Sequence, residues 1–186
     1  MISRKLERKK EERRKNFSFF LLSFLFLALG HATTYLELSL DDLINQTELA
    51  FYGEVTAVEV VGRSGEPWTQ VSFQVTEALL GLDAETESVT LEFYGGELNG
   101  RSLRVNLMPS FSVGEAVLVL AYNSAELYSP VVGFRQGLWR DTGLGLVDAI
   151  NRTLSLDAEG ELSLDGAGGG LDDILAALQV RLEEAQ

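Results

Sequence analysis

The pattern of apolar and polar positions in the first half of the chain predicts a β-hairpin. Residues 51–61 are rich in β-branched and aromatic side chains, and residues 68–76 alternate, with Val71 and Phe73 on the same face. Alternation of this kind is typical of a strand with one buried face. Turn-forming residues at 62–67 separate the two runs, so we expect an antiparallel pair.

A second pattern marks the centre of the fold. Ala116–Ala121 is an almost unbroken apolar run that follows a turn containing Pro109 and Gly114. A short continuous apolar run between turns indicates a strand that is covered on both faces. We therefore expect this segment to be the central strand, with the other strands packed around it.

Further strands are expected on either side of this central run. Gly133 and Gly137 interrupt one of them, and glycines inside a strand usually mark bulges or bends that curl a sheet. The predicted fold class is mainly β: an antiparallel OB-like β-barrel of about six strands plus a peripheral hairpin. The additional strands are predicted at residues 89–93, 103–107 and 131–139, and the peripheral hairpin at 145–150 and 154–156.

Two helices flank the strands. Ser39 and Asp42 have the spacing of a capping box at the start of a short leading helix. Leu171–Glu184 has apolar residues at helical spacing and predicts a C-terminal amphipathic helix. Residues 157–170 are rich in glycine and are expected to be a linker. We expect the helix to be an appendage that folds back over the barrel; the alternative is that its apolar face binds a partner.

The N-terminus has the pattern of a secretory signal. Residues 1–16 contain eight basic side chains, residues 17–29 are apolar, and Gly30 and Ala32 are small residues suited to cleavage after position 32. The predicted organisation is a signal peptide at 1–32, a β-barrel domain at 33–156, the linker, and a helix at 171–186. An uncleaved N-terminal anchor is the alternative, and it would be the only membrane attachment. We expect an exported protein that is periplasmic, bound to the cell envelope or secreted.

The charge of the segment after residue 32 limits its partners. Residues 33–186 contain 25 acidic side chains against 7 arginines, which gives a formal net charge of −18. Nucleic acids and anionic membrane surfaces are bound largely through lysine and arginine. We therefore expect no nucleic-acid partner, and a protein or cell-envelope component is the expected kind of partner.

The residues that are missing exclude several chemistries. The only histidine is His31, the last lysine is Lys15, and the chain has no cysteine. After residue 32 the chain cannot form a Ser-His-Asp triad, a Cys-His dyad, a Schiff-base lysine or a zinc site of histidine and cysteine ligands. We expect no enzyme activity, no cofactor, and no catalytic, cofactor-binding or metal-binding residue.

Three short motifs have ordinary structural explanations. The triplet Asp141-Thr142-Gly143 matches that of aspartic proteases, but those enzymes need two such aspartates, and Asp-x-Gly is common in turns. Carboxylates at Asp157, Glu159, Glu161 and Asp165 lack the spacing of an EF-hand and indicate a solvated turn. Glycosylation sequons begin at Asn45 and Asn151.

Aromatic and basic residues supply the remaining candidates for binding. We expect the large aromatic residues to lie in the core or at the barrel mouth, and any two or three exposed on one face would form a binding patch. The arginines between residues 95 and 140 are expected to pair with surface carboxylates, or to form a small basic area. The residues concerned are Trp68, Phe93, Phe111, Phe134 and Trp139, and Arg101, Arg104, Arg135 and Arg140.

A set of turn glycines and core residues resembles a known family. The residues are Phe51-x-Gly53-x-Val55, Trp68, Leu79-Leu80-Gly81, Gly95-Gly96, Pro109-x-Phe111-x-x-Gly114-Glu115 and Gly133-x-x-Gln136-Gly137. Over about residues 40–139 the pattern resembles exported bacterial proteins with an OB-like barrel, similar to the netrin-like domain of tissue metalloproteinase inhibitors. The N-terminal cysteines of those inhibitors are missing, so their metal-chelating mechanism does not follow from the resemblance.

These observations favour a non-enzymatic exported β-barrel domain that binds a protein or a cell-envelope component. A glycosidase-like hydrolase that uses only carboxylates is one alternative, because acidic residues are abundant. A protease inhibitor that acts through an exposed loop is another, which only the family resemblance suggests.

Overall fold

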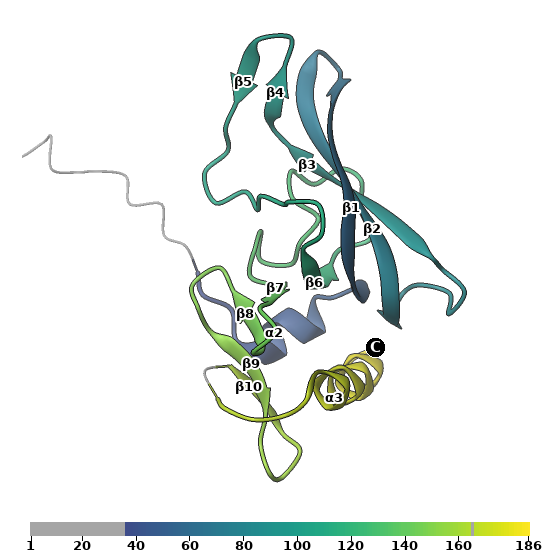
Figure 1. Ribbon diagram of the computed structural model, residues 1–186, viewed down its shortest axis with the longest axis vertical. Coiled ribbons are helices and arrows are strands. Elements are labelled where there is room, and N and C mark those ends of the chain that lie inside the picture. Colours follow the sequence, from purple (N-terminus) through teal and green to yellow (C-terminus); the bar gives the residue numbers. More distant parts are fainter. Residues whose placement is uncertain (1–35, 165) are drawn as a thin grey trace, which may run out of the picture. The chain divides into compact units, whose positions relative to one another are not determined.

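The computed structural model describes residues 36–164 and 166–186, so the predicted signal segment lies outside the described residues. Glu37–Gln186 form one contact unit, and Figure 1 shows that it is mainly β, with a large antiparallel sheet and two helices. Neither of the helices in the described segments is both long enough and apolar enough to cross a lipid bilayer.

The main sheet is open. Its strands, in spatial order, are β10 (Leu162–Leu164), β9 (Thr153–Leu156), β8 (Leu146–Asp148), β7 (Leu138–Asp141), β6 (Ala116–Ala121), β1 (Leu49–Arg63), β2 (Glu66–Leu80) and β3 (Ser88–Tyr94). Among the described strands, β10 and β3 are the two edges and do not pair with each other. The expected antiparallel sheet is confirmed, but the closed OB-like barrel is not, because the ends of the described sheet do not meet.

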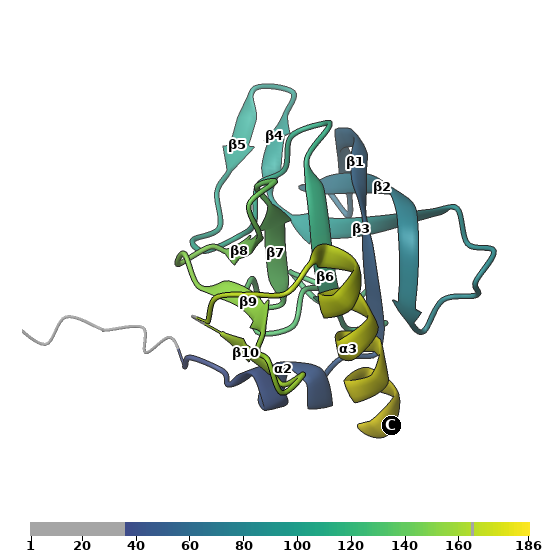
Figure 2. The same ribbon diagram turned by 60° about the horizontal axis from the view of Figure 1, so that its bottom comes forward.

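A helix packs against strands from both halves of the sheet. Helix α3 (Leu171–Glu184) contacts β2 on one side and β9 and β10 on the other, and Figure 2 shows it lying across the front of the sheet. Its buried residues are Ile174, Leu175, Leu178 and Leu182. The helix is thus part of the core and is not an appendage.

The predicted hairpin is confirmed and is longer than the pattern indicated. Strands β1 and β2 have 15 residues each, and Ser64 and Gly65 connect them with φ of 53° and 85°. Two successive left-handed residues are typical of a type I′ turn, whose twist suits a hairpin. Within β1, only residues 49–54 pair with the central strand β6. The far half of the hairpin therefore extends beyond β6.

The central strand is confirmed and separates two apolar cores. Leu118 and Leu120 belong to the core that includes both helices. Val117 and Val119 point to the other face, where they join Phe73 and other residues of the hairpin. All four side chains are fully buried, which is what an unbroken apolar run predicts for a strand covered on both faces.

Helix α2 (Leu40–Asn45) forms as its capping residues predict. The Ser39 hydroxyl accepts a hydrogen bond from the Asp42 backbone N–H, and the Asp42 carboxylate accepts one from the Ser39 backbone N–H. The helix buries Leu43 and Ile44 in the core shared with α3. The capping box therefore positions the apolar face of a helix that has only six residues.

Three predicted segments need correction. The strand expected at 103–107 is only the short strand β5 (Arg101–Leu103), which pairs with β4 (Gly96–Leu98). The strand does not continue to residue 107, because the chain turns at Leu107 with φ of 67°. Most of the strand expected at 131–139 is a turn, in which Gly133 and Phe134 have positive φ. Strand β10 lies inside the expected linker because its backbone pairs with β9. Local apolar content indicated strands, but these turns and pairings determine where strands begin and end.

Candidate functional site

An apolar groove of about 450 Å³ lies between the far half of the hairpin and the chain that follows β3. Its floor includes Val58 and Val60 of β1 and Phe93 of β3. Its wall comes from the segment that follows β4 and includes Leu103, Val105, Met108 and Phe111. We call this hollow the hairpin groove.

The floor of the hairpin groove arises because the hairpin extends beyond β6, the strand that pairs with its base. Val58 lies opposite Val71 and Val60 opposite Thr69 in the β1–β2 ladder, beyond the part of β1 that pairs with β6. Val58 is 36% exposed, whereas Val71, directly opposite on β2, is fully buried. Apolar surface on this face therefore becomes accessible at β1, past the part of β1 that pairs with β6.

The segment that follows β3 approaches this floor closely at Gly96. A Cβ atom at Gly96 would lie 2.9 Å from Cγ1 of Val60, and the residue has φ of 131°. Only glycine combines this backbone conformation with such close contact. The Gly95-Gly96 pair therefore allows β4 to leave the sheet and form one side of the groove.

The opposite wall is fixed by aromatic and polar contacts. The ring of Phe111 lies 5.6 Å from that of Phe73 and 5.0 Å from that of Phe93, measured between centroids. The Arg140 guanidinium donates a hydrogen bond to the Ser110 carbonyl and lies 3.6 Å from a carboxylate oxygen of Glu115. The wall is therefore held in place by contacts within the protein itself.

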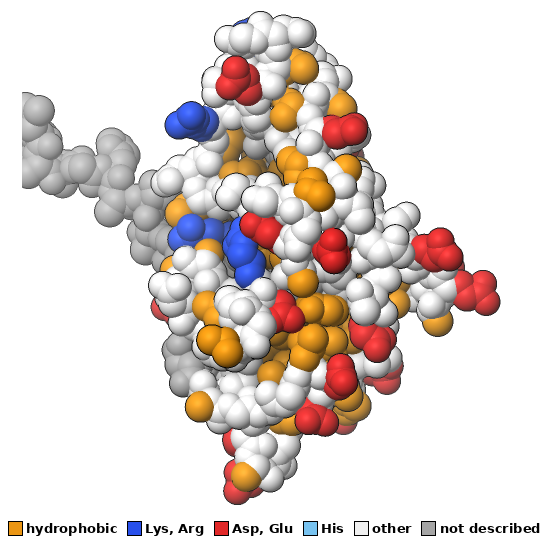
Figure 3. Space-filling model, in the orientation of Figure 1, with side chains coloured by type: hydrophobic (Ala, Val, Ile, Leu, Met, Phe, Trp, Pro, Cys, Tyr) orange, Lys and Arg blue, Asp and Glu red, His pale blue; other side chains and the backbone are white. Residues whose placement is uncertain are grey.

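Among the described residues, Arg104 is the only charged one that lines the hairpin groove. Its side chain is exposed, and it forms no ion pair or hydrogen bond with another residue in the described ranges. Thr69, another polar residue of the lining, donates its hydroxyl to the Gly95 carbonyl at 2.8 Å. On the face shown in Figure 3, basic side chains gather on the left, and most acidic ones lie to the right and below.

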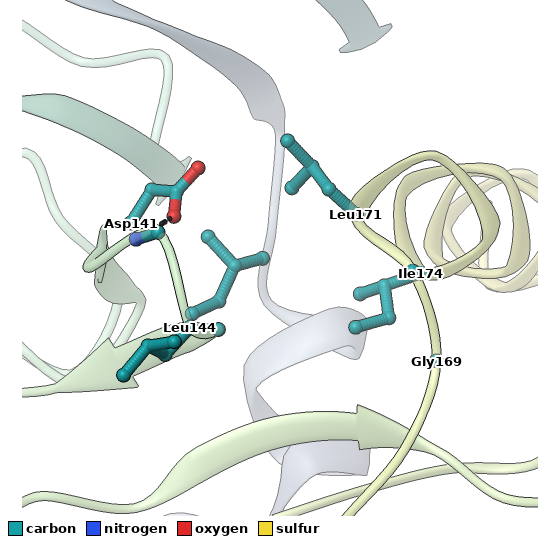
Figure 4. A pocket seen from close by; sticks show the side chains of 9 residues that line it. Asp141, Leu144, Gly169, Leu171 and Ile174 are labelled. Carbon is teal, nitrogen blue, oxygen red and sulfur yellow. Dashed lines mark hydrogen bonds between the residues drawn. The ribbon is translucent and has the colours of Figure 1, made fainter.

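A second, smaller hollow contains the aspartate of the protease-like triplet. It measures about 290 Å³ and lies between the β7–β8 turn and the start of α3. Figure 4 shows Asp141 and Leu144 on one side and Leu171 and Ile174 on the other. Leu144 is 98% exposed, so this hollow is open to solvent.

The hydrogen bonds of Asp141 indicate a structural role. One carboxylate oxygen accepts from the Gly143 N–H at 2.7 Å, and the other accepts from the Tyr52 hydroxyl at 2.8 Å. Burial, together with the hydrogen bond to and the charge of Asp141, raises the pKa of Tyr52 to about 12. No other carboxylate lines this hollow in the described part of the chain. A paired-aspartate mechanism would require a second one.

The acidic cluster also forms a turn. One Asp157 oxygen accepts from the backbone N–H groups of Glu159 and Glu161 at 3.0 and 2.8 Å. Asp165, the fourth predicted carboxylate, lies outside the described residues. Over the described ranges, no group of three or more acidic, histidine or cysteine side chains is arranged to hold a metal ion.

The sequon at Asn151 includes a buried ion pair. The Arg152 side chain is 9% exposed and contacts Asp148 and Glu37, each at 2.7 Å. Asp148 also accepts hydrogen bonds from the backbone N–H groups of Ile150 and Arg152. This cluster joins Glu37, near the start of the described residues, to the β8–β9 turn. We therefore assign it a structural role.

The aromatic candidates are mainly core residues, as expected. Trp139 and Phe93 are at most 1% exposed, while the Arg63 guanidinium lies 4.8 Å from the ring centroid of the buried Trp68. None of the five residues forms an exposed patch, because Phe111 and Phe134 are both half-buried. Phe111 instead contributes to the wall of the hairpin groove.

The predicted arginines divide into two kinds. Arg101 lies 3.8 Å from Glu66, and Arg140 pairs with Glu115, so both contact carboxylates as expected. Arg104 does not, and its importance for the groove was not apparent from the sequence. Val58 and Val60 were also missed. Their signal was an alternation that continues past the segment covered by other strands.

No family model, curated protein or solved structure matched this chain. The resemblance to netrin-like domains therefore stays a prediction. Among the described residues, the hairpin groove is the site with the strongest physical support for binding, because it is apolar, accessible and walled by contacts within the protein.

Proposed function

We propose that the protein is a non-enzymatic binding domain that holds an apolar part of a protein or cell-envelope component in the hairpin groove. The observation that supports this most directly is the uncovered floor at Val58 and Val60. Small-molecule sites are typically apolar hollows of roughly 300–1,000 Å³ with few polar groups. At about 450 Å³ the groove lies within that range.

The side chains around the groove support binding more than catalysis. The described residues that line it include one arginine and a few hydroxyl groups, but no carboxylate. A carboxylate-only hydrolase stays an alternative, and Asp141 in the second hollow is its best candidate. That reading gains no support from the hydrogen bonds of Asp141, because both of its oxygens are already bonded within the protein.

Fluorescence of N-phenyl-1-naphthylamine, a neutral apolar dye, tests the proposal. We expect the dye to bind, and Val58→Glu to weaken its affinity by about tenfold or more, because the variant places a charge on the apolar floor. Val113→Glu is the matched control, since Val113 is 66% exposed and does not line the groove. Equal effects of the two variants, or no dye binding to the parent protein, would contradict the proposal.

We also propose that the protein is exported, on the strength of the pattern in residues 1–32. The mature chain recovered from its natural source should then begin at or near Thr33. Mass spectrometry of the intact protein would measure this directly. Recovery of residues 1–32 on the chain in a membrane fraction would favour the anchor alternative.

A further inference from the structure

The unpaired arginine in the hairpin groove is unusual for this chain. Carboxylates outnumber arginines by 25 to 7 after residue 32, and most arginines of the described ranges form an ion pair. Arg101 of the same strand region contacts Glu66. Arg104 is only three residues away, lines an apolar groove, and has no such partner among the described residues. A basic group is thus available next to apolar surface.

The hydrogen bonding of the groove limits what can lie along it. The Thr69 hydroxyl is bonded to the Gly95 carbonyl, the Ser110 carbonyl to Arg140, and the Val105 carbonyl to the Met108 N–H. An extended peptide would bring its own backbone donors and acceptors into this apolar surface and leave many of them unsatisfied, which is costly. A hydrocarbon chain brings none.

We propose that the hairpin groove binds a single-chain amphiphile with a negatively charged head, such as a long-chain carboxylate. The chain lies along Val58, Val60 and Met108, and the head contacts the Arg104 guanidinium, which matches carboxylate geometry. The unbranched Met108 side chain adapts its shape to an apolar chain. This inference depends on the proposed function and names the ligand class of the same groove.

The test compares two competitors with the same chain and opposite heads. Dodecanoate and dodecyltrimethylammonium, each below its micellar concentration, are used to displace N-phenyl-1-naphthylamine. The formal net charge of −18 after residue 32 favours the cation at long range. A preference for the anion must therefore come from the groove itself. We expect half-displacement by dodecanoate at a concentration about fivefold lower than by the cation.

Two arginine variants distinguish a direct contact between Arg104 and the carboxylate head from the effect of the overall charge of the protein. Arg104→Gln should abolish the preference for dodecanoate, whereas Arg101→Gln should preserve it. Both variants remove one exposed positive charge, but Arg101 does not line the groove. Equal loss in the two variants would overturn the inference, because the preference would then reflect net charge alone.

The outcomes also separate this inference from the proposed function. If the parent protein does not bind the dye, the groove is not a binding site and both proposals fail. If the dye binds and the cation displaces it as well as the anion does, the amphiphile inference fails while the apolar binding function stands. Preference for the anion that is lost only in Arg104→Gln supports both.

Discussion

The two faces of the central strand are covered in different ways. On one face, Leu118 and Leu120 are fully buried in a core that includes both helices. On the other face, Val117 and Val119 pack against the hairpin and Phe111, and the apolar surface continues into an open groove. The same strand therefore supports a closed core and an accessible one.

The length of the covering elements determines where a binding surface arises. Helix α3 has 14 residues and lies across the sheet between β2 and β9. On the groove side, β6 pairs with only the first part of the 15-residue strand β1. The apolar residues beyond that pairing are left for the wall segment, which covers them incompletely.

The largest expected effect comes from a charge in the closed core. Leu118→Asp should destabilise the protein by about 4 kcal/mol or leave it unfolded, because the carboxylate would be buried without a partner. Urea denaturation followed by circular dichroism measures this. Leu144→Asp is the control, since Leu144 is 98% exposed. A midpoint for Leu118→Asp equal to that of the control would contradict the central position of β6.

Shortening a buried side chain of α3 should show that the core on the helix side depends on this helix. Leu178→Ala should cost about 3 kcal/mol, because Leu178 is fully buried in the helix-side core. Val180→Ala, at a 55% exposed position of the same helix, should cost less than about 0.5 kcal/mol.

The groove side offers the matching measurement. Met108 is half-buried and lines the groove, so Met108→Ala should cost only about 1 kcal/mol. Comparable denaturation midpoints for Leu178→Ala and Met108→Ala would show that the two faces are equally closed, contrary to the structure.

A smaller effect is expected from the hydroxyl that joins β1 to β7. Tyr52 donates to Asp141, and its pKa is raised from 10.0 to about 12. The neutral phenol is therefore favoured in the folded state, and its contribution is complete below about pH 10 and lost as the pH rises through about 12. Tyr52 is half-exposed, so solvent screening limits the contribution to about 1 kcal/mol.

Tyr52→Phe checks this contribution. The variant should be less stable than the parent protein by about 1 kcal/mol near neutral pH, and the difference should shrink as the pH rises towards 12. Asp141→Asn keeps the phenol but removes the charge that helps to raise its pKa, so the loss of stability above about pH 10 should be smaller than in the parent and should end at a lower pH. Parallel pH profiles for the parent protein and Tyr52→Phe would contradict the assignment.

The smallest effect on stability is expected at the open end of the groove. Val58→Glu should change the free energy of unfolding by no more than about 0.5 kcal/mol, because Val58 is already 36% exposed. The same variant weakens dye binding in the proposal above. A large loss of stability would show that Val58 belongs to the closed core and that the groove is not open there.

Local patterns predicted much of the secondary structure. Alternation identified the hairpin, the continuous apolar run identified β6, and Ser39 with Asp42 identified the start of α2. These features depend on residues a few positions apart, which the sequence shows directly. Segments that depend on distant pairing were predicted less well: β10 was missed because its pairing with β9 was not apparent from its own residues.

The candidate groove could not be predicted in the same way. Its wall requires contact between Phe111 and Phe73, and its floor requires β6 to end its pairing before Val58. Arg101 and Arg104 look alike in the sequence, yet only Arg101 contacts a carboxylate in the described chain. Such differences arise from tertiary contacts between segments that are far apart along the chain.

The amino-acid sequence alone specifies the β-rich class, the strand buried on both faces, the acidic charge and the lack of histidine, cysteine and lysine after residue 32. It does so because composition and short-range periodicity are properties of the chain alone. The tertiary structure decided that the sheet stays open, that α3 completes the core, and that Val58 and Arg104 share a groove. These outcomes depend on which elements, distant in the sequence, pack over an apolar surface. The extent of that packing is determined only when the chain folds.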